Sequence, residues 1–495
     1  MSETEVVIVG AGPTGLTLAH ELALAGVQTL VLEKLTERVQ QVKGGAIQPR
    51  TAEMLELRGL LEPMLRRALP GPPVGANFAL LPVPLDCRSW DTRHLSPIML
   101  PQWEIEEVLE KRATALGARI RRDAAVTSVE ADDDGVTVTT DDGLRVRARY
   151  AVACDGGRSA VRKKLGMPFP GRDGTYLAVL ADIRLSAVSP LVPRERGQIS
   201  TLTRQANGYW AMLIPLGDDR YRLTYGHEGP ADRTRDTPVG EDEIAAALRA
   251  VYGGETVLGG VDNASRFSDA TRQVEQYREG RVLFAGDAAH IHPPLGAQGL
   301  NLGVQDAFNL GWKLAATVQG RAPAGLLDSY HAERHPVAAR VLHHTSAQRV
   351  LADPRASEDV AALRDIFIDL MRLPDTNRYL AGLISGLALH YDVPGAHPLA
   401  GQRVPDADLR TDAGPTRLSA LFGAGHAVLL DVGGLVPDDV TLPGRVDLVR
   451  GKSTTDLGAG ALLLRPDGYV CWAADDAEAC RAGVLDAVAE HLTTG

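Results

Sequence analysis

The chain of 495 residues is 44% hydrophobic and 23% charged, which is ordinary for a soluble globular protein of about two to four domains. Its 52 Lys and Arg residues against 63 Asp and Glu residues give a net charge of −11, so we expect no nucleic-acid partner, which would require clustered positive charge. The acidic first residues, and the lack of an apolar run of about 18 residues, argue against a secretion signal and a membrane span.

The cysteines point to a reducing compartment. They are Cys87, Cys154, Cys471 and Cys480, and none of them has C-x-x-C or zinc-finger spacing. We therefore expect no disulfide framework, no metal site and a cytoplasmic location.

The chain begins with the pattern of a β-α-β unit. Val6–Val9 is β-branched, a helical pattern runs from Thr14 to Ala25, and Thr29–Leu32 is apolar again and ends at Glu33. The periodicity then predicts helices over Thr51–Arg67 and Gln102–Leu116. Alternation from Arg119 to Tyr150, with Asp-Asp-Gly turns, predicts a β-meander.

The middle and end of the chain alternate between sheet and helix patterns. Residues 175–230 predict an antiparallel sheet, and residues 328–392 are mostly helical. A composition break at Pro394–Pro405 precedes a separate α/β region. The other predicted elements are a helix at Glu241–Tyr252, a buried strand at Arg281–Ala285, a long helix from Gly299, strands at Ala427–Leu430, Val446–Val449, Ala461–Leu464 and Tyr469–Ala473, and a helix near 476–492.

A dinucleotide-binding turn follows the first strand. Gly10-Ala11-Gly12-Pro13-Thr14-Gly15 has G-x-G-x-x-G spacing, in which the glycines permit a tight turn, close approach of a pyrophosphate and packing of the helix on the strand. Glu33 ends the next strand 18 residues after Gly15, where its carboxylate would accept hydrogen bonds from a ribose and repel a 2′-phosphate. The site therefore favours FAD or NAD over NADP.

Two further strands end in Asp-containing segments. Cys154-Asp155-Gly156-Gly157-Arg158 follows one strand and Ala285-Gly286-Asp287-Ala288-Ala289-His290 follows another. Open α/β sheets bind ligands at the carboxyl ends of their strands, and Asp287 could accept from the ribityl hydroxyls of a flavin. A loop cap or Asx turn is the alternative for each Asp.

In order and spacing, these three segments resemble the class A FAD-dependent aromatic hydroxylases, in particular the aromatic polyketide hydroxylase and rifampicin monooxygenase branch. The resemblance covers essentially the whole chain. Its other motifs are Pro101-Gln102, His290-Ile291-His292-Pro293-Pro294, Gly299-Leu300-Asn301-Leu302-Gly303, Asp306-Ala307, Asn309-Leu310-Gly311-Trp312-Lys313-Leu314 and Tyr330-His331-Ala332-Glu333-Arg334.

The resemblance implies an α/β fold with a Rossmann-like FAD-binding domain, an inserted antiparallel-sheet substrate domain and a C-terminal thioredoxin-like domain. The implied boundaries are 1–174 and 276–395 for the two parts of the FAD-binding domain with its helical region, 175–275 for the middle sheet and 396–495 for the last domain. The last domain lacks C-x-x-C, so thiol exchange is not expected.

The resemblance also assigns site residues. FAD is expected to contact Gly10, Gly12, Pro13, Thr14, Gly15, Glu33, Lys43, Arg50, Gln102, Asp155, Gly156, Asp287, Gly299, Leu300 and Asn301, with Pro294, Gly299 and Leu300 beside the flavin ring. Lys43 stands where relatives usually carry Arg, and Arg50 is the better-matched cation of that region. Arg158 and Arg162 are candidate partners of NAD(P)H, although ordinary surface ion pairs are as good an interpretation.

The substrate wall is predicted from the middle sheet. Tyr209, Trp210, Met212 and Tyr225, with Phe267, are pocket candidates, although periodicity alone favours the core of the sheet. Leu295, near the flavin, would also shape the wall.

The function implied is an NAD(P)H-using, FAD-dependent monooxygenase that inserts one oxygen atom of O₂ into an aromatic polyketide-type substrate through a flavin C4a-hydroperoxide. Partners are O₂ and a polycyclic aromatic molecule, with no nucleic acid or membrane, and a homodimer is a further expectation. No protein base is assigned, because His290 and His292 lie beside a turn, where His is more often a structural hydrogen-bonder. The alternatives are an antibiotic-inactivating monooxygenase acting on rifamycins or tetracyclines, a flavin dehydrogenase or reductase, and a protein with a structural flavin.

Overall fold

The computed structural model describes residues 2–40, 44–69, 75–227, 234–353, 356–395 and 397–493. Lys43 therefore lies outside the described residues. Among them, no helix combines the length and apolar character needed to cross a membrane, no three His, Cys, Asp or Glu side chains are grouped as metal ligands would be, and all four cysteines are buried free thiols.

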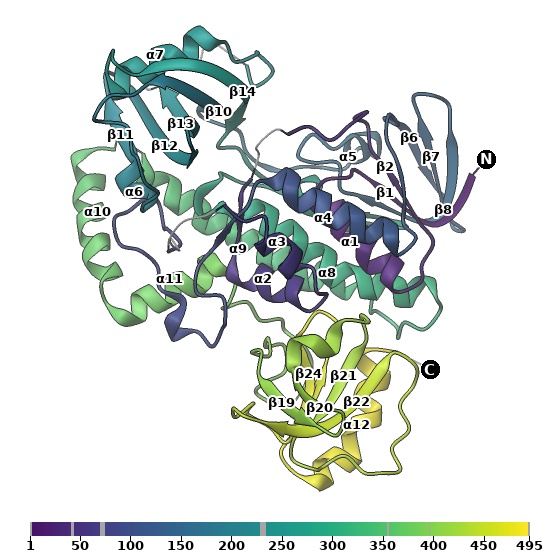
Figure 1. The fold of residues 1–495 in the computed structure, drawn as a ribbon. Coiled ribbons are helices and arrows are strands. Elements are labelled where there is room, and N and C mark those ends of the chain that lie inside the picture. Colours follow the sequence, from purple (N-terminus) through teal and green to yellow (C-terminus); the bar gives the residue numbers. More distant parts are fainter. Residues whose placement is uncertain are drawn as a thin grey trace.

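An eight-stranded mixed sheet carries the predicted β-α-β unit (Figure 1). Strand β1 pairs in parallel with β2 on one side and β8 on the other, and β8 pairs in parallel with β17. Strands β6, β7 and β8 form the predicted meander, whereas β5 joins β2 in parallel. The strands are β1 (Ser2–Val9), β2 (Thr29–Leu32), β5 (Arg119–Arg121), β6 (Val126–Ala131), β7 (Val136–Thr140), β8 (Arg145–Ala153), β16 (Arg278–Glu279) and β17 (Val282–Phe284).

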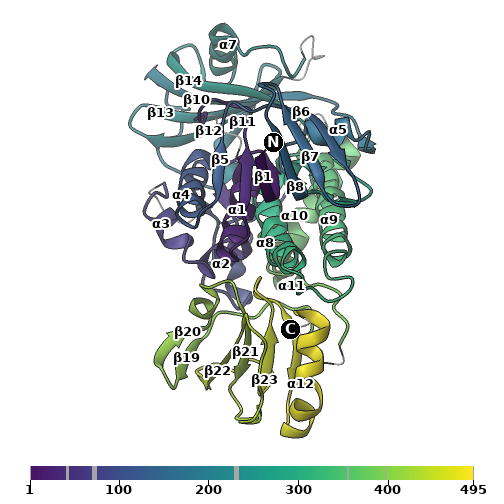
Figure 2. The same ribbon diagram turned by 90° about the vertical axis from the view of Figure 1, so that its right-hand side faces the viewer.

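Helices α1 (Pro13–Leu24) and α8 (Gly299–Val318), far apart in sequence, pack side by side (Figure 2). Glycines permit this contact. A Cβ on Gly303 would lie 2.3 Å from Thr14 Oγ1, and one on Gly311 would lie 2.5 Å from Glu21 Cβ. The N-terminus of α8 is thereby fixed close to the glycine turn at the start of α1.

The single helix predicted over Thr51–Arg67 is wrong. The segment forms α2 (Pro49–Glu56) and α3 (Leu61–Leu65), separated by Gly59 in the left-handed region at φ +63°. The apolar periodicity continues through the break, which is why the sequence pattern did not reveal it. The prediction at Gln102–Leu116 is confirmed as α4 (Gln102–Ala115).

A five-stranded antiparallel sheet with the order β11-β12-β13-β10-β14 lies beyond the first sheet, with α7 (Glu241–Tyr252) on its outer face (Figure 1). Ile244, Leu248 and Tyr252 of α7 are fully buried against it. The sheet extends past the predicted 175–230 because β14 adds to its edge. Its elements are β10 (Leu177–Ala187), α6 (Ile199–Leu202), β11 (Thr203–Ala206), β12 (Tyr209–Gly217), β13 (Arg220–His227) and β14 (Val257–Ser268).

Small elements and long helices connect these two layers. A three-stranded sheet consists of β9 (Gly171–Arg172), β15 (Thr271–Gln273) and β18 (His290–Ile291), and a two-stranded one of β3 (Ala46–Ile47) and β4 (Ile98–Met99). The helices are α5 (Ala160–Lys164), α9 (Ser329–Ala352), α10 (Glu358–Met371) and α11 (Pro374–Ser385), so the helical prediction for 328–392 is confirmed.

The C-terminal residues form a separate lobe below the other layers (Figures 1 and 2). Its six-stranded sheet has the order β20-β19-β22-β21-β23-β24, with α12 (Ala477–His491) packed on β23 and β24. The predicted domain boundaries and the thioredoxin-like assignment stay predictions. The strands are β19 (Asp408–Thr411), β20 (Gly414–Arg417), β21 (Ala427–Asp431), β22 (Val446–Ser453), β23 (Ala461–Leu464) and β24 (Val470–Ala474).

Candidate active site

One cavity of about 1330 Å³ joins the eight-stranded sheet, the five-stranded sheet and the segment 291–300. It exceeds the ~300–1,000 Å³ of ordinary small-molecule pockets, so it has room for a dinucleotide and a second planar molecule. The sequence-predicted residues that line it are Gly10, Gly12, Pro13, Thr14, Glu33, Gln102, Asp155, Gly156, Tyr209, Trp210, Met212, Tyr225, Asp287, Pro294, Leu295, Gly299 and Leu300.

The glycine turn is built to admit a phosphate. Gly10 has φ +105°, and a Cβ there would lie 2.4 Å from the carbonyl oxygen of Cys154. A Cβ on Gly15 would lie 2.0 Å from the oxygen of Gly10, so Gly15 supports the turn from behind and does not line the cavity. A Cβ on Gly12 would meet nothing within 4 Å, and Gly12 begins α1 without a side-chain cap. Open space in front of uncapped helix amides fits a pyrophosphate.

Glu33 is held beside this turn. Its Oε2 accepts from the N–H of Ala11 at 2.8 Å and its Oε1 from the N–H of Leu35 at 3.0 Å. Each carboxylate oxygen has a second lone pair, so Glu33 can also accept from a ribose hydroxyl in the cavity.

The two Asp segments lie side by side because β8 and β17 are neighbouring parallel strands. Asp155 Oδ2 accepts from the N–H groups of Ala160 (2.6 Å) and Val161 (3.2 Å), which confirms the capping alternative for this oxygen. Its Oδ1 is buried and has no hydrogen bond to the described residues, and burial raises the pKa of the carboxyl group. A ligand that donates a hydrogen bond to Oδ1 would offset the free-energy cost of burying this oxygen without a partner. Asp287, exposed at the end of β17, lines the cavity beside it.

The segment at the N-terminus of α8 forms the other wall. A Cβ on Gly44 would lie 3.3 Å from Gln102 Oε1 and 3.5 Å from Leu300 Cδ1, so these side chains meet at one point of the wall. Asn301 does not line the cavity. Its Oδ1 accepts from the N–H of Gln48 at 2.8 Å, and its Nδ2 donates to the oxygen of Ala46 at 2.9 Å, so it fixes the wall from behind.

Sequence reasoning missed Gln48. This side chain lines the cavity, and its Nε2 donates to the carbonyl oxygen of Gly296 at 2.8 Å. Its place next to Pro49 was visible, but nothing in the local pattern distinguishes a cavity-lining Gln from a surface one.

Arg50, which was predicted to contact the cofactor, does not line the cavity. Arg50 is buried away from the cavity, where it donates to Glu53 at 2.9 Å, the carbonyl oxygen of Asp467 at 3.1 Å and the hydroxyl of Tyr469 at 3.3 Å. Helix α2 turns this side chain toward the C-terminal lobe. The charge of Arg50 therefore holds two parts of the chain together, outside the lining of the cavity.

Of the two candidate histidines, His290 is structural. Its Nε2 lies 2.7 Å from Asp306 Oδ2, and Arg334 Nε lies 2.7 Å from Asp306 Oδ1, with all three side chains fully buried. Burial opposes ionisation of Asp306, but the charges of Arg334 and His290 lower its pKa. This cluster joins α8 to α9 and does not line the cavity.

His292 lines the cavity but is a poor base. Its Nδ1 donates to the oxygen of Pro293 at 2.7 Å, which leaves the lone pair on a buried Nε2. Burial and the neighbouring His290 lower its pKa to about 4. Because a general base works best with a pKa near the operating pH, the geometry assigns no proton abstraction to His292.

We expect the buried His344 of α9 to make the folded protein less stable in acid. Burial and nearby cations lower its pKa from 6.5 to about 3. Below pH 6.5 the unfolded chain binds a proton at this position that the folded protein does not bind, so stability falls as the pH falls. From pH 7 to pH 5 this one group accounts for about 2 kcal/mol. Between pH 7 and pH 5, the free energy of unfolding of the wild type should therefore fall by about 2 kcal/mol more than that of His344→Gln, as measured by urea denaturation.

The exposed neighbour His343 provides the control. His343→Gln should follow the wild type, and a His344→Gln variant with the wild-type pH dependence would contradict the assignment.

The pocket candidates of the middle sheet divide by strand alternation. Trp210 and Met212 face the cavity together with Ile214, whereas Tyr209 and Tyr225 pack mainly in the core under α7. Trp210 pairs with Gly226 on β13, and a Cβ on Gly226 would lie 2.5 Å from Trp210 Nε1. Because Gly226 has no side chain, the indole of Trp210 can approach β13 this closely.

Comparisons with known proteins agree with this geometry. Residues 3–345 match the family described as FAD binding domain, and residues 397–494 match the family described as aromatic-ring hydroxylase, C-terminal. The rifampicin monooxygenase of Streptomyces venezuelae is 44% identical over 477 residues, which cover 95% of this chain and 96% of that relative.

Two solved structures superpose on nearly the whole chain. The anhydrotetracycline hydroxylase OxyS from Streptomyces rimosus is 46% identical with a TM-score of 0.88, and 99% of each chain is covered. The Diels-Alderase PyrE3, from the biosynthetic pathway of pyrroindomycins, is 38% identical with a TM-score of 0.85, again covering 99% of each chain.

Proposed function

Because this chain belongs to the FAD-dependent aromatic-ring hydroxylases, we propose that it inserts one oxygen atom of O₂ into a polycyclic aromatic substrate of polyketide type, with NADPH or NADH as the reductant. One observation carries this proposal. A single cavity joins the phosphate-binding turn at Gly12 to a chamber lined by Trp210, Met212 and the N-terminus of α8.

The residues present fit FAD. The turn of Gly10, Gly12 and Pro13 would hold the pyrophosphate, Glu33 the adenosine ribose, and Asp287 with Gln102 the ribityl chain. Bound there, the flavin supplies the electron transfer and the activation of O₂ that no amino-acid side chain can supply.

The side chains and backbone would position the flavin and the substrate, stabilise charge on the ring and exclude water. The first amides of α8 belong to Gly299 and Leu300, which line the cavity, and amides at this position have no acceptor within the helix. Together with the helix dipole they would stabilise negative charge on a reduced ring by about 0.5–2 kcal/mol. The apolar wall made by Met212, Leu295 and Leu300 would keep water from the reacting atoms.

The similarity to an anhydrotetracycline hydroxylase favours a linear, fused-ring phenol as the substrate class. The similarity to a rifampicin monooxygenase keeps inactivation of an antibiotic as the second candidate. A homodimer and the choice between the two reductants remain part of the proposal.

The test measures reductant oxidation in air by the FAD-loaded enzyme, with anhydrotetracycline, rifampicin or no aromatic compound added. We expect one of the two compounds to accelerate NADPH or NADH oxidation at least tenfold and to gain one oxygen atom by mass.

Two other outcomes have defined meanings. Stoichiometric H₂O₂ with neither compound changed would reject both as substrates. Turnover of either compound without O₂ would indicate a dehydrogenase or reductase.

A further inference from the structure

Arg349, near the C-terminal end of α9, presents a guanidinium to the cavity without using its donors. The side chain lines the cavity, and its Nε is buried with no hydrogen-bond partner among the described residues. The nearest carboxylate oxygen is Asp269 Oδ2, at 3.7 Å from Nε, which is an ion-pair distance but too long for a hydrogen bond. A guanidinium has five N–H donors in a planar fork, and no hydrogen bond from Arg349 to the described residues uses them.

Asp269 cannot satisfy Arg349 because it already serves other groups. It is fully buried, and its Oδ1 accepts from the N–H groups of Thr175 (2.6 Å) and Tyr176 (3.2 Å). Its Oδ2 accepts from Thr175 Oγ1 at 2.8 Å and from Arg172 Nη1 at 3.1 Å. Asp269 therefore fixes the loop before β10 and attracts Arg349 only from a distance.

The same carboxylate positions a second donor. Tyr176, whose N–H bonds to Asp269, lines the cavity with its side chain. Burial and the charge of Asp269 raise the pKa of its hydroxyl to about 12, so it carries its proton at neutral pH and can donate. Asp353, the residue after α9, also lines the cavity, as do the charged side chains of Arg158, Arg196, Arg235, Glu243 and Arg266.

We propose that Arg349 and Tyr176 form a subsite that binds an ionised oxygen, a carboxylate or enolate, on the planar substrate. This proposal rests on the proposed function, because it assigns the site to the substrate. Tyr176 directly precedes Leu177, which pairs with Ser268 of β14, and Phe267 of that strand lines the cavity too. The subsite thus belongs to the sheet that also carries Trp210 and Met212.

The test uses the oxidised, FAD-loaded enzyme and two probes of the same shape, anthraquinone-2-carboxylate and anthraquinone-2-carboxamide. Binding is followed by the change in flavin absorbance, so no turnover is needed. We expect the wild type to bind the carboxylate at least tenfold more tightly than the neutral amide. Arg349→Gln should reduce this preference to less than twofold, and Arg349→Lys should keep part of it, because Lys retains the charge without the fork.

Tyr176→Phe removes only the hydroxyl and should lower the preference about threefold, as expected for one lost hydrogen bond. Arg340→Gln, an exposed cation on the same helix, should behave as the wild type. Tyr176→Phe also keeps the proposal testable if Arg349→Gln fails to fold.

Three results would overturn the subsite. The first is that the wild type binds both probes equally or binds neither. The second is that Arg349→Gln keeps the full preference for the carboxylate. The third is that Arg349→Gln binds NADP⁺ more weakly but keeps the probe preference, which would assign the cation to the reductant. Failure to hydroxylate any compound would refute the proposed function but leave these affinities readable.

Discussion

Gly12→Val is expected to give a folded protein that no longer retains FAD. Gly12 has φ −78° and ψ −178°, an extended conformation that valine also adopts. A Cβ there meets no protein atom within 4 Å, so the fold should change by less than about 0.5 kcal/mol. The same space is where a pyrophosphate would approach the amides of α1, and the isopropyl group would fill it. We expect FAD affinity to fall at least 100-fold, about 2.7 kcal/mol.

The measurement is the FAD content per chain after purification, together with the dissociation constant of the reconstituted apoprotein. Gly240→Val is the matched control. Gly240 also begins a helix in extended backbone with open space in front of it, but it does not line the cavity. This variant should keep its FAD. A yellow Gly12→Val protein with stoichiometric FAD would remove the turn from the cofactor site.

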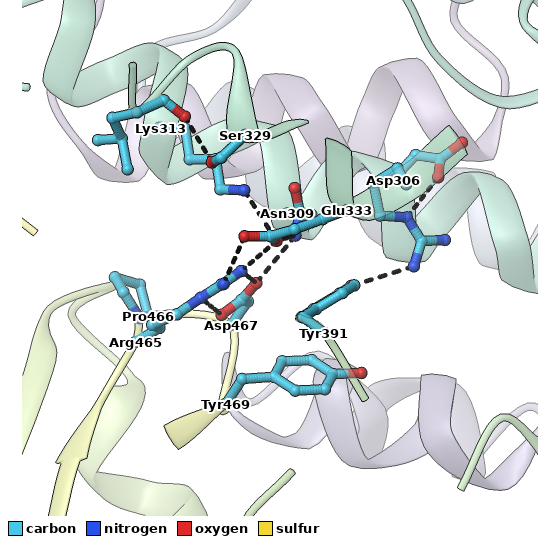
Figure 3. A network of polar contacts seen from close by, with 12 residues as sticks. Asp306, Asn309, Lys313, Ser329, Glu333, Tyr391, Arg465, Pro466, Asp467 and Tyr469 are labelled. Atoms are coloured by element: carbon cyan, nitrogen blue, oxygen red, sulfur yellow. Dashed lines mark hydrogen bonds and ion pairs between the residues drawn. The ribbon is translucent and has the colours of Figure 1, made fainter. Parts of the chain in front are cut away.

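Arg465→Leu is expected to detach the C-terminal lobe from the rest of the molecule. Figure 3 shows Arg465 between Glu333 of α9 and Asp467. Its Nη1 and Nη2 donate to the two oxygens of Glu333 at 2.8 and 2.9 Å, and Nη2 donates to Asp467 at 2.6 Å. Lys313 Nζ of α8 lies 2.8 Å from Glu333 Oε2.

Removing Arg465 leaves two buried carboxylates facing one lysine. An uncompensated buried charge of this kind costs about 3–5 kcal/mol. We expect a loss of unfolding free energy of that size and rapid proteolysis between residues 394 and 405. Arg481→Leu, an exposed position of α12 in the same lobe, should change stability by less than about 0.5 kcal/mol. A loss below about 1 kcal/mol in Arg465→Leu would show that this buried ion-pair cluster does not hold the lobe.

Local features of the sequence predicted the geometry of the glycine turn well. A Cβ at Gly10 or Gly15 would clash with backbone atoms a few residues away or after a paired strand. The spacing of these glycines therefore predicts the geometry of the turn. The β-α-β unit and the start of α8 at Gly299 follow from periodicity in the same way. The helix break at Gly59 was missed because the apolar pattern runs through it.

Local sequence patterns could not predict contacts between segments that are far apart in the chain. The family resemblance assigned Arg50 to the cofactor site, but its partners, Asp467 and Tyr469, are more than 400 residues away. Arg349 and Tyr176 become neighbours of the Asp269 carboxylate only when α9 packs against β15, the strand that follows Asp269. No local pattern records either arrangement.

Isotope labelling tests most directly whether this cavity, as we propose, transfers oxygen from O₂ to a planar substrate. PyrE3, a Diels-Alderase, shares the fold, so the fold alone does not decide the reaction. With NADPH or NADH, an accepted polycyclic phenol and ¹⁸O₂, we predict a product that contains one ¹⁸O atom, and no such product from Gly12→Val. A product that carries no ¹⁸O, or whose new oxygen comes from labelled water, would contradict the account.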